Sequence, residues 1–266
     1  EPVLFTGDRL EKEYTDVPGQ WNGIYFLSSS IGNKISHSVI RNSVHGITLG
    51  EPEAAVPGPD LKLLFSEISH HSVNGLTAIN AVVVAANCLF SHTGRHCINI
   101  SSGGEYSFTH CTIANQWDYG LRLTPSVMIS EKPVLPAGAV SQLNLDLNNC
   151  VVHGDFISEI DIIPSGNHLS GNYFFDHCLL KLDTVSSPFW IKERFPGAQI
   201  NKNPRFIEPF SYDFRPDTLS PLIDSGNDIY LAEYPVDIRN VSRLDDGRPD
   251  PGAYERIPGE GKKNNR

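Results

Sequence analysis

Three polar residues in the middle of the chain have the types and spacing that acid–base chemistry on a sugar requires. Counting nine residues beyond a repeated apolar position gives one outward-facing column: Thr77, Asn99, Arg122 and Asp161, with Thr48 as the counterpart one turn earlier. His96 is expected near Arg122 and Asp161. Together they would supply a base, an acid and a cation for a uronate, which are the groups needed for β-elimination or hydrolysis of a polysaccharide. We therefore predict Arg122, Asp161 and His96 as catalytic candidates. An ordinary salt bridge on a solvated sheet is the alternative interpretation.

Neighbouring residues are candidates for holding the substrate. Aromatic rings beside polar groups suit the flat faces of sugar rings, and Trp117 and Tyr119 flank Asp118. The predicted substrate-binding residues are Asn99, Trp117, Asp118, Tyr119 and Glu159. The alternative is that the two aromatic side chains close the end of a turn and contact only protein.

A repeat of about 22 residues must position these groups. Its apolar anchor positions are Ile40, Ile68, Phe90, Ile113, Val152 and Leu180. Between them, apolar residues alternate over short runs, which is the period of a β-strand, and helical periodicity is scarce. Few Asn-Gly or Asp-Gly pairs lie between the apolar runs, which disfavours a β-sandwich built from hairpins. We predict an all-β, single-stranded right-handed parallel β-helix, with inserted loops at 50–60 and 124–138 and an extended C-terminal tail packed on it.

Four of the five cysteines share one place in this repeat: Cys88, Cys111, Cys150 and Cys178. Equivalent residues of stacked turns lie about 4.8 Å apart, so these side chains should form a column that points into the core. Parallel side chains on in-register strands do not readily reach the torsion angle of a disulfide. We predict reduced, packed thiols. Ser38 occupies the same place in an earlier turn, which weakens a metal-site interpretation.

Five of the ten histidines fall into two sets of corner positions. One set is His37, Asn87, His110, Asn149 and His177, and the other is Asn42, His70, His92 and Asn115. Stacked polar side chains at a corner hydrogen-bond to one another and to the turn backbone. This structural role is favoured over a catalytic or metal-binding one for each of these histidines.

The composition of the chain excludes some classes of binding partner. A net charge of −10, with no basic cluster except the closing GKKNNR, argues against nucleic acid and anionic membranes. No apolar run is long enough to span a bilayer, and no signal peptide opens the chain. The chain opens without Met, so we expect a processed or trimmed product. No cofactor and no metal site is predicted, although calcium is left open.

Several segments resemble the right-handed parallel β-helix proteins of the pectate-lyase-like superfamily. They are EPVLFTGDRL, GQWNGIYF, NKISHSVIRNSVHGI, SPLIDSGND and DDGRPDPGAYE. The similarity is strongest to exported or surface proteins of Bacteroidetes-type bacteria, in which PVLFTG follows earlier turns of the helix. It implies a periplasmic or outer-surface location, a polysaccharide or cell-surface glycan as partner, and a lipid or surface anchor, if any, outside this chain.

The resemblance also suggests a division of the chain. We expect a β-helix over 1–200 that lacks earlier N-terminal turns, a segment over 201–257 that packs on the helix, and a disordered tail over 258–266. Ion pairs are expected to tie the packed segment, through Arg239, Arg243, Asp246, Asp250 and Glu255.

The resemblance transfers no activity. The Asn-Thr-Asp and Gly-His-Gly signatures of polygalacturonase-like enzymes and the Arg-x-Pro-x-x-Arg run of pectate lyases are missing from this sequence. Three hypotheses therefore stay open: an exported module that binds or helps process carbohydrate, a true polysaccharide lyase or glycoside hydrolase, and a structural or adhesive surface module. Only an enzyme needs an unpaired carboxylate or base in its groove.

Overall fold

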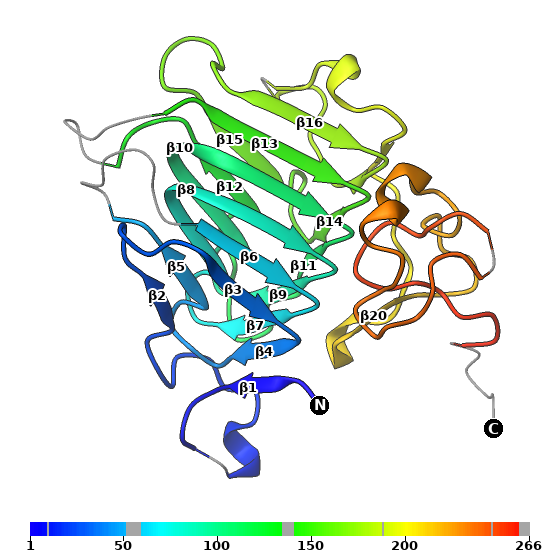
Figure 1. The fold of residues 1–266 in the computed structure, drawn as a ribbon, viewed down its shortest axis with the longest axis horizontal. Helices are drawn as coiled ribbons and strands as arrows, with labels where there is room; N and C mark the ends of the chain where they lie inside the picture. The colour runs from blue at the N-terminus through cyan, green and yellow to red at the C-terminus, as the bar shows by residue number, and fades with distance from the viewer. Residues whose placement is uncertain (10, 52–59, 135–140, 188, 246, 261–266) are drawn as a thin grey trace.

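The chain winds into a parallel β-helix, and its C-terminal segment packs along one side (Figure 1). The computed structural model describes residues 1–9, 11–51, 60–134, 141–187, 189–245 and 247–260. Within these residues, every strand pairing between turns of the coil is parallel, and each turn contributes to three walls. The second wall leads into the third at one corner, and the third leads back to the first at the next.

The first wall consists of β2 (Ile24–Phe26), β5 (Ile47–Leu49), β8 (Leu76–Ala86), β10 (Ile98–Thr109), β12 (Val127–Ser130) and β15 (Ile160–Ile163). The second consists of β3 (Asn33–Ser36), β6 (Asp60–Leu64), the later halves of β8 and β10, β13 (Leu143–Asn148) and β16 (Asn172–Asp176). The third consists of β1 (Val3–Phe5), β4 (Ser38–Arg41), β7 (Glu67–His71), β9 (Leu89–Thr93), β11 (Thr112–Asn115), β14 (Val151–Gly154), β17 (Leu179–Leu180) and β18 (Gln199–Ile200).

Short elements complete the fold. Two 3₁₀ turns belong to the β-helix, η1 (Lys12–Tyr14) and η2 (Lys192–Arg194). The C-terminal segment contains an antiparallel pair and two further 3₁₀ turns: β19 (Phe206–Glu208), β20 (Asp213–Pro216), η3 (Pro209–Ser211) and η4 (Asp228–Ala232).

The register of the third wall confirms the predicted anchor positions. Ile40 pairs with Ile68 and Ile68 with Phe90, and the column continues through the later anchors to Leu180. All six anchor side chains are fully buried. At the C-terminal end of the coil, the stacked rings of Phe175 and Phe195, 4.6 Å apart, close the core. A repeated apolar residue therefore sets the register, because a slip of one position would expose the whole column.

The four repeated cysteines form the predicted column. All are buried and free of disulfides. The thiol of Cys150 accepts a hydrogen bond from the Cys111 backbone N–H (3.4 Å), and the thiol of Cys178 accepts one from Cys150 (3.3 Å). Ser38 and Ser66 continue the column, since the Ser38 N–H donates to the Ser66 hydroxyl (3.1 Å). A small side chain that also accepts a hydrogen bond is what this position requires.

The polar corner between the second and third walls follows from backbone geometry. His37, Asn87, His110, Asn149 and His177 all have positive φ angles between 47° and 52°. Asn and His adopt this left-handed conformation more readily than most residues, which explains their recurrence before each cysteine. Because each such residue turns the chain by the same amount, successive strands enter the third wall in register.

At the other corner, His70 and His92 stack as predicted, with their ring centroids 4.9 Å apart, but the predicted hydrogen bonds are missing from both His70 ring nitrogens and from the His92 Nδ1 in the described structure. Tyr212 of the C-terminal segment packs edge-on against both rings. Burial lowers the pKa of His70 to about 4 and that of His92 to about 3, so both rings are neutral at pH 7.

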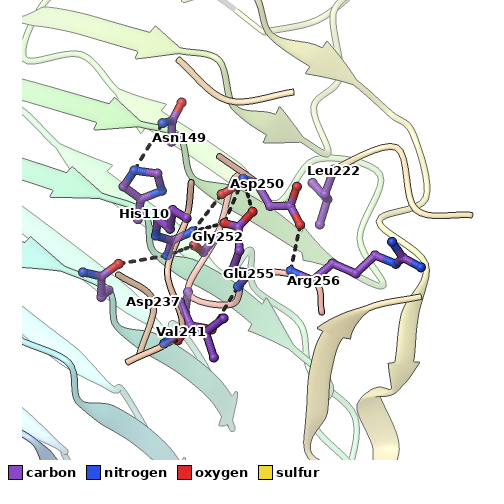
Figure 2. A network of polar contacts seen from close by, with 12 residues as sticks. His110, Asn149, Leu222, Asp237, Val241, Asp250, Gly252, Glu255 and Arg256 are labelled. Carbon is purple, nitrogen blue, oxygen red and sulfur yellow. Dashed lines mark hydrogen bonds and ion pairs between the residues drawn. The ribbon is translucent and has the colours of Figure 1, made fainter. Parts of the chain in front are cut away.

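The C-terminal segment docks onto the corner that carries Asn87 and Asn149 (Figure 2). The buried guanidinium of Arg243 donates to the Asn87 side chain (2.9 Å) and to the Glu255 carboxylate (3.0 Å). The Asn149 amide accepts from the Asn227 backbone N–H (2.7 Å) and donates to the Asn227 carbonyl (3.0 Å). Asn87 and Asn149 were expected to hydrogen-bond within the corner. In the structure they also bind the C-terminal segment. Asp246, also expected in its ion pairs, lies outside the described residues.

One of the two predicted loops is only partly a loop. Residues 124–138 include strand β12, which supplies this turn's part of the first wall. Most of the other predicted loop, residues 52–59, lies outside the described residues, as do residues 135–140 and the end of the expected tail, 261–266.

Candidate functional site

The outward column of the first wall is correctly predicted except at one position. Thr48, Thr77, Asn99, Met128 and Asp161 pair with one another in that order. Met128 stands where the sequence predicted Arg122. Only nine residues separate each anchor from this column in the neighbouring turns, but 15 separate Ile113 from Met128. The extra six residues lie between β11 and β12, and they carry Arg122 off the face.

Arg122 lies instead in a buried ion pair with Glu159 (4% and 0% side-chain exposure). Its two terminal nitrogens donate to the two carboxylate oxygens at 2.9 and 2.6 Å. Glu159 also accepts the Ser126 N–H (2.8 Å), the Ser126 hydroxyl (2.7 Å) and the Phe156 N–H (2.8 Å). This network ties the β11–β12 segment to the β14–β15 segment. Neither partner reaches solvent as a ligand-binding side chain would.

His96 is also buried. Its Nδ1 lies 2.8 Å from the Pro125 carbonyl, and burial lowers the pKa of its imidazole. Arg122 and Asp161 are both close enough to influence that pKa in opposite directions. The structure thus gathers the three catalytic candidates at one corner, but leaves only Asp161 exposed.

Trp117, Asp118 and Tyr119 lie on the β11–β12 segment, in contact with other parts of the protein. The rings of Trp117 and Tyr119 are 5.4 Å apart, and the Tyr119 hydroxyl donates to the Asp16 carbonyl (3.1 Å). Trp117 is half-buried, whereas Asp118 is exposed. Asn99 is half-buried on the outer face of β10. The two rings contact each other, but Tyr119 is 47% exposed, so these contacts decide between neither of the two interpretations.

A groove of about 340 Å³ opens beside Asp161 at the end of the first wall. Its walls are the β14–β15 segment, including Phe156 and Ile157, and the segment after β17, including Asp183 and Ser187. Ile157 is 81% exposed. Asp183 accepts backbone N–H bonds from Ser186 and Val185, which lower the pKa of its carboxyl group. We call this the Asp161 groove.

Sequence reasoning missed Phe156, Ile157, Asp183 and Ser187, because they lie in segments that do not follow the repeat. The run GDFISE between two alternating strands was the available signal, since it places two large apolar residues in a turn. The groove therefore contains one predicted residue and several unpredicted ones.

Among the described residues, no group of three or more His, Cys, Asp or Glu side chains is arranged to hold a metal ion. No helix in the described ranges is long and apolar enough to cross a membrane.

The parallel walls, the stacked cysteines and the left-handed corners describe one coil repeated along an axis, and the model of the right-handed β-helix region matches residues 22–193. The chain belongs to the right-handed β-helix family. Neither a curated protein nor a solved structure matches it.

The family membership confirms the predicted fold class and fits a protein of the pectate-lyase-like superfamily. It names no substrate and no catalytic residue. The chemistry of this β-helix must therefore be argued from its own grooves.

Proposed function

We propose that this β-helix is a non-catalytic glycan-binding module, and that the Asp161 groove is its binding site. The observation that carries the proposal is the composition of the groove. An exposed carboxylate, serine hydroxyls and the apolar surface of Phe156 and Ile157 line one cavity of about 340 Å³. Sites that recognise small polar molecules combine a mostly apolar wall with a few placed polar groups, and the volume lies in the usual range.

Charge favours a neutral glycan over a uronate. Among the described residues, two carboxylates, Asp161 and Asp183, line the groove, and no Lys or Arg does. Arg122 lies over the Phe156 ring, 4.7 Å from its centroid, but its guanidinium is held by Glu159. Bringing an anionic sugar beside two carboxylates would cost electrostatic energy that no groove-lining side chain offsets. A divalent cation such as calcium would be needed to bridge a uronate to this groove.

The outer face of the first wall offers a continuation for a longer chain. Thr48, Thr77 and Asn99 are half-buried side chains in line with Asp161, one per turn of the coil. Neighbouring strands are about 4.8 Å apart, so these hydroxyl and amide groups recur at a short, regular interval along the helix axis. An extended polysaccharide lying along this face would meet a hydrogen-bonding group at each turn except that of Met128, which stands between Asn99 and Asp161 and offers an apolar contact instead.

Location is part of the proposal. The resemblance of the closing SPLIDSGND and DDGRPDPGAYE segments to those of exported proteins of Bacteroidetes-type bacteria supports a periplasmic or outer-surface site of action. A net charge of −10 supports a partner that is not an anionic polymer.

The test is a binding screen of the purified chain against neutral and acidic polysaccharides, with and without calcium. The screen records retention on the polysaccharide and the release of reducing or unsaturated ends. We expect binding to a neutral glycan, no new ends, and at least tenfold weaker binding for Asp161→Ala and for Ile157→Ser. Asp146→Ala is the matched control, because Asp146 is an exposed carboxylate on the second wall. Equal weakening by the control, or preferential binding of acidic glycans without calcium, would contradict the proposal.

Glycoside hydrolysis is the second candidate, and the presence of two carboxylates in one groove favours it. Hydrolysis needs one carboxyl group as acid and another as base or nucleophile. The bonds to Ser186 and Val185 lower the pKa of Asp183, which suits the base or nucleophile and leaves the acid role to Asp161. New reducing ends that disappear in both Asp161→Asn and Asp183→Asn would establish this activity in place of simple binding.

A further inference from the structure

A second cavity, of about 490 Å³, lies on the other side of the β14–β15 segment from the Asp161 groove. The β-helix supplies one wall through Gln116, His153 and Asp155, which follow or end strands β11 and β14. The C-terminal segment supplies the other wall through Asn203, Arg205 and Phe210. We call this cavity the His153 pocket.

Both walls are fixed by contacts among the lining residues and with the neighbouring Phe214. The Asn203 side chain accepts a hydrogen bond from the Arg205 backbone N–H (2.8 Å). Phe206 packs edge-on against Phe214 at 5.3 Å and against His153 at 6.5 Å. The cavity is thus held between the coil and the docked segment, and its shape does not depend on a single flexible loop.

Two polar side chains of the β-helix wall, Gln116 and Asp155, are available to a ligand, and the His153 ring belongs to the same lining. Within the described ranges, the Gln116 amide makes no hydrogen bond although the residue is buried, and Asp155 makes no hydrogen bond or ion pair. The His153 Nδ1 is buried against the protein without a described partner, and burial lowers the pKa of His153 to about 4, so its ring is neutral at pH 7. Gln116 is buried without a described hydrogen bond, so a ligand that satisfies its amide gains affinity, whereas the Asp155 carboxylate is exposed.

The charge balance excludes most anions. Arg205 is the one cation of the pocket lining, and it forms an ion pair with Asp217 at 3.2 Å. Asp155 remains as a carboxylate facing the cavity. On the opposite side, the Phe210 ring is 67% exposed and offers an apolar face next to these polar groups.

From these contacts we infer that the His153 pocket binds a single neutral sugar unit. The Gln116 amide and the Asp155 carboxylate supply both donors and acceptors, which is what adjacent sugar hydroxyls require. The Phe210 ring covers an apolar face of the sugar. This site is separate from the Asp161 groove, because its lining comes from the residues around the ends of β11 and β14 and from the C-terminal segment, and we assign it one sugar unit.

The test uses small ligands that are too short to occupy the outer face of the first wall. The methyl glycosides of glucose, galactose, mannose and xylose are titrated against the whole chain by ligand-observed NMR, with methyl glucuronide as the anionic probe. We expect at least one neutral glycoside to bind, and the affinity to fall at least tenfold in Phe210→Ala and in Asp155→Ala. Phe174→Ala, which truncates an exposed ring on β16, is the matched control and should leave the affinity unchanged.

Three results would overturn the inference. They are the absence of binding of any neutral glycoside, equal binding in both pocket variants, and equal affinity for methyl glucuronide. Glycoside binding that is lost in Asp161→Ala but kept in Phe210→Ala would assign the sugar to the Asp161 groove and also reject the pocket. Polysaccharide binding in the separate screen can fail or succeed independently of these results.

Discussion

Replacing Arg122 with Met should destabilise the fold strongly, because Arg122 is a structural residue and not a catalytic one. Glu159 is fully buried and accepts two bonds from the guanidinium and three from neutral donors. The variant removes the only formal positive charge from that set and leaves a buried carboxylate. Removing one partner of a buried ion pair costs about 3–5 kcal/mol, whereas an exposed pair is worth about 0–1 kcal/mol. We expect the larger value.

The assay is urea unfolding followed by the fluorescence of the three tryptophans. A lower midpoint with an unchanged slope reports a change in the free energy of unfolding alone. The double variant Arg122→Met/Glu159→Gln should lose at least about 1 kcal/mol less than the sum of the two single variants, because the two side chains are in direct contact. A cost below about 1 kcal/mol for Arg122→Met, with no coupling to Glu159, would refute the assignment of a buried ion pair.

Three further predictions test the fold. Cys111→Asp should unfold the domain, because it places a carboxylate in the buried column. Cys111→Ser should fold, because serine occupies the same column in earlier turns. Thermal unfolding of the two variants measures the difference. Burial lowers the pKa of His92 from its ordinary value of about 6.5 to about 3 in the folded chain. The unfolded chain therefore gains a proton first as the pH falls, and the free energy of unfolding decreases between about pH 6.5 and pH 3, by about 1.4 kcal/mol per pH unit. Urea midpoints at pH 7 and pH 4.5 should therefore differ less for His92→Asn than for the native chain, and His168→Asn, at an exposed position, should not change the difference. Arg243→Met removes the four hydrogen bonds of the buried guanidinium, so amide hydrogen exchange should become faster over 237–256 and stay unchanged in β8 and β10. An equal change of the exchange rates in both regions would contradict this docking role.

The repeating part of the structure could be predicted from the sequence because each turn solves the same packing problem. The anchor at Ile68 or Phe90 must be apolar, the residue two before it must be small, and the residue before that must tolerate a positive φ. These three local requirements fix strand direction, register and the inward face. These requirements do not determine the number of turns or the lengths of the insertions between them.

The position of Arg122 could not be predicted by counting from the anchor, because counting assumes turns of equal length. The six extra residues before β12 move Met128 into the column. The alternation of Val127 and Ile129 was the available signal for that strand, since both side chains are buried. A local apolar alternation was therefore a better guide than a constant spacing.

Contacts made by non-repeating segments were beyond sequence reasoning. Arg243 and Asn87 are 156 residues apart, and nothing in either local sequence indicates that they meet. The Asp161 groove and the His153 pocket likewise form where the β14–β15 segment meets parts of the chain that follow no repeat. Both cavities depend on how these segments pack against the coil, which the repeat does not encode.

The most direct measurement of the central claim is a titration of the native chain and of Asp161→Ala with the neutral polysaccharide that the screen identifies, followed by an assay for reducing ends. The account predicts tight binding by the native chain, at least tenfold weaker binding by the variant, and no new ends from either. Equal affinity of the two proteins would contradict the Asp161 groove as the binding site, and new ends from the native chain alone would show that the groove performs hydrolysis.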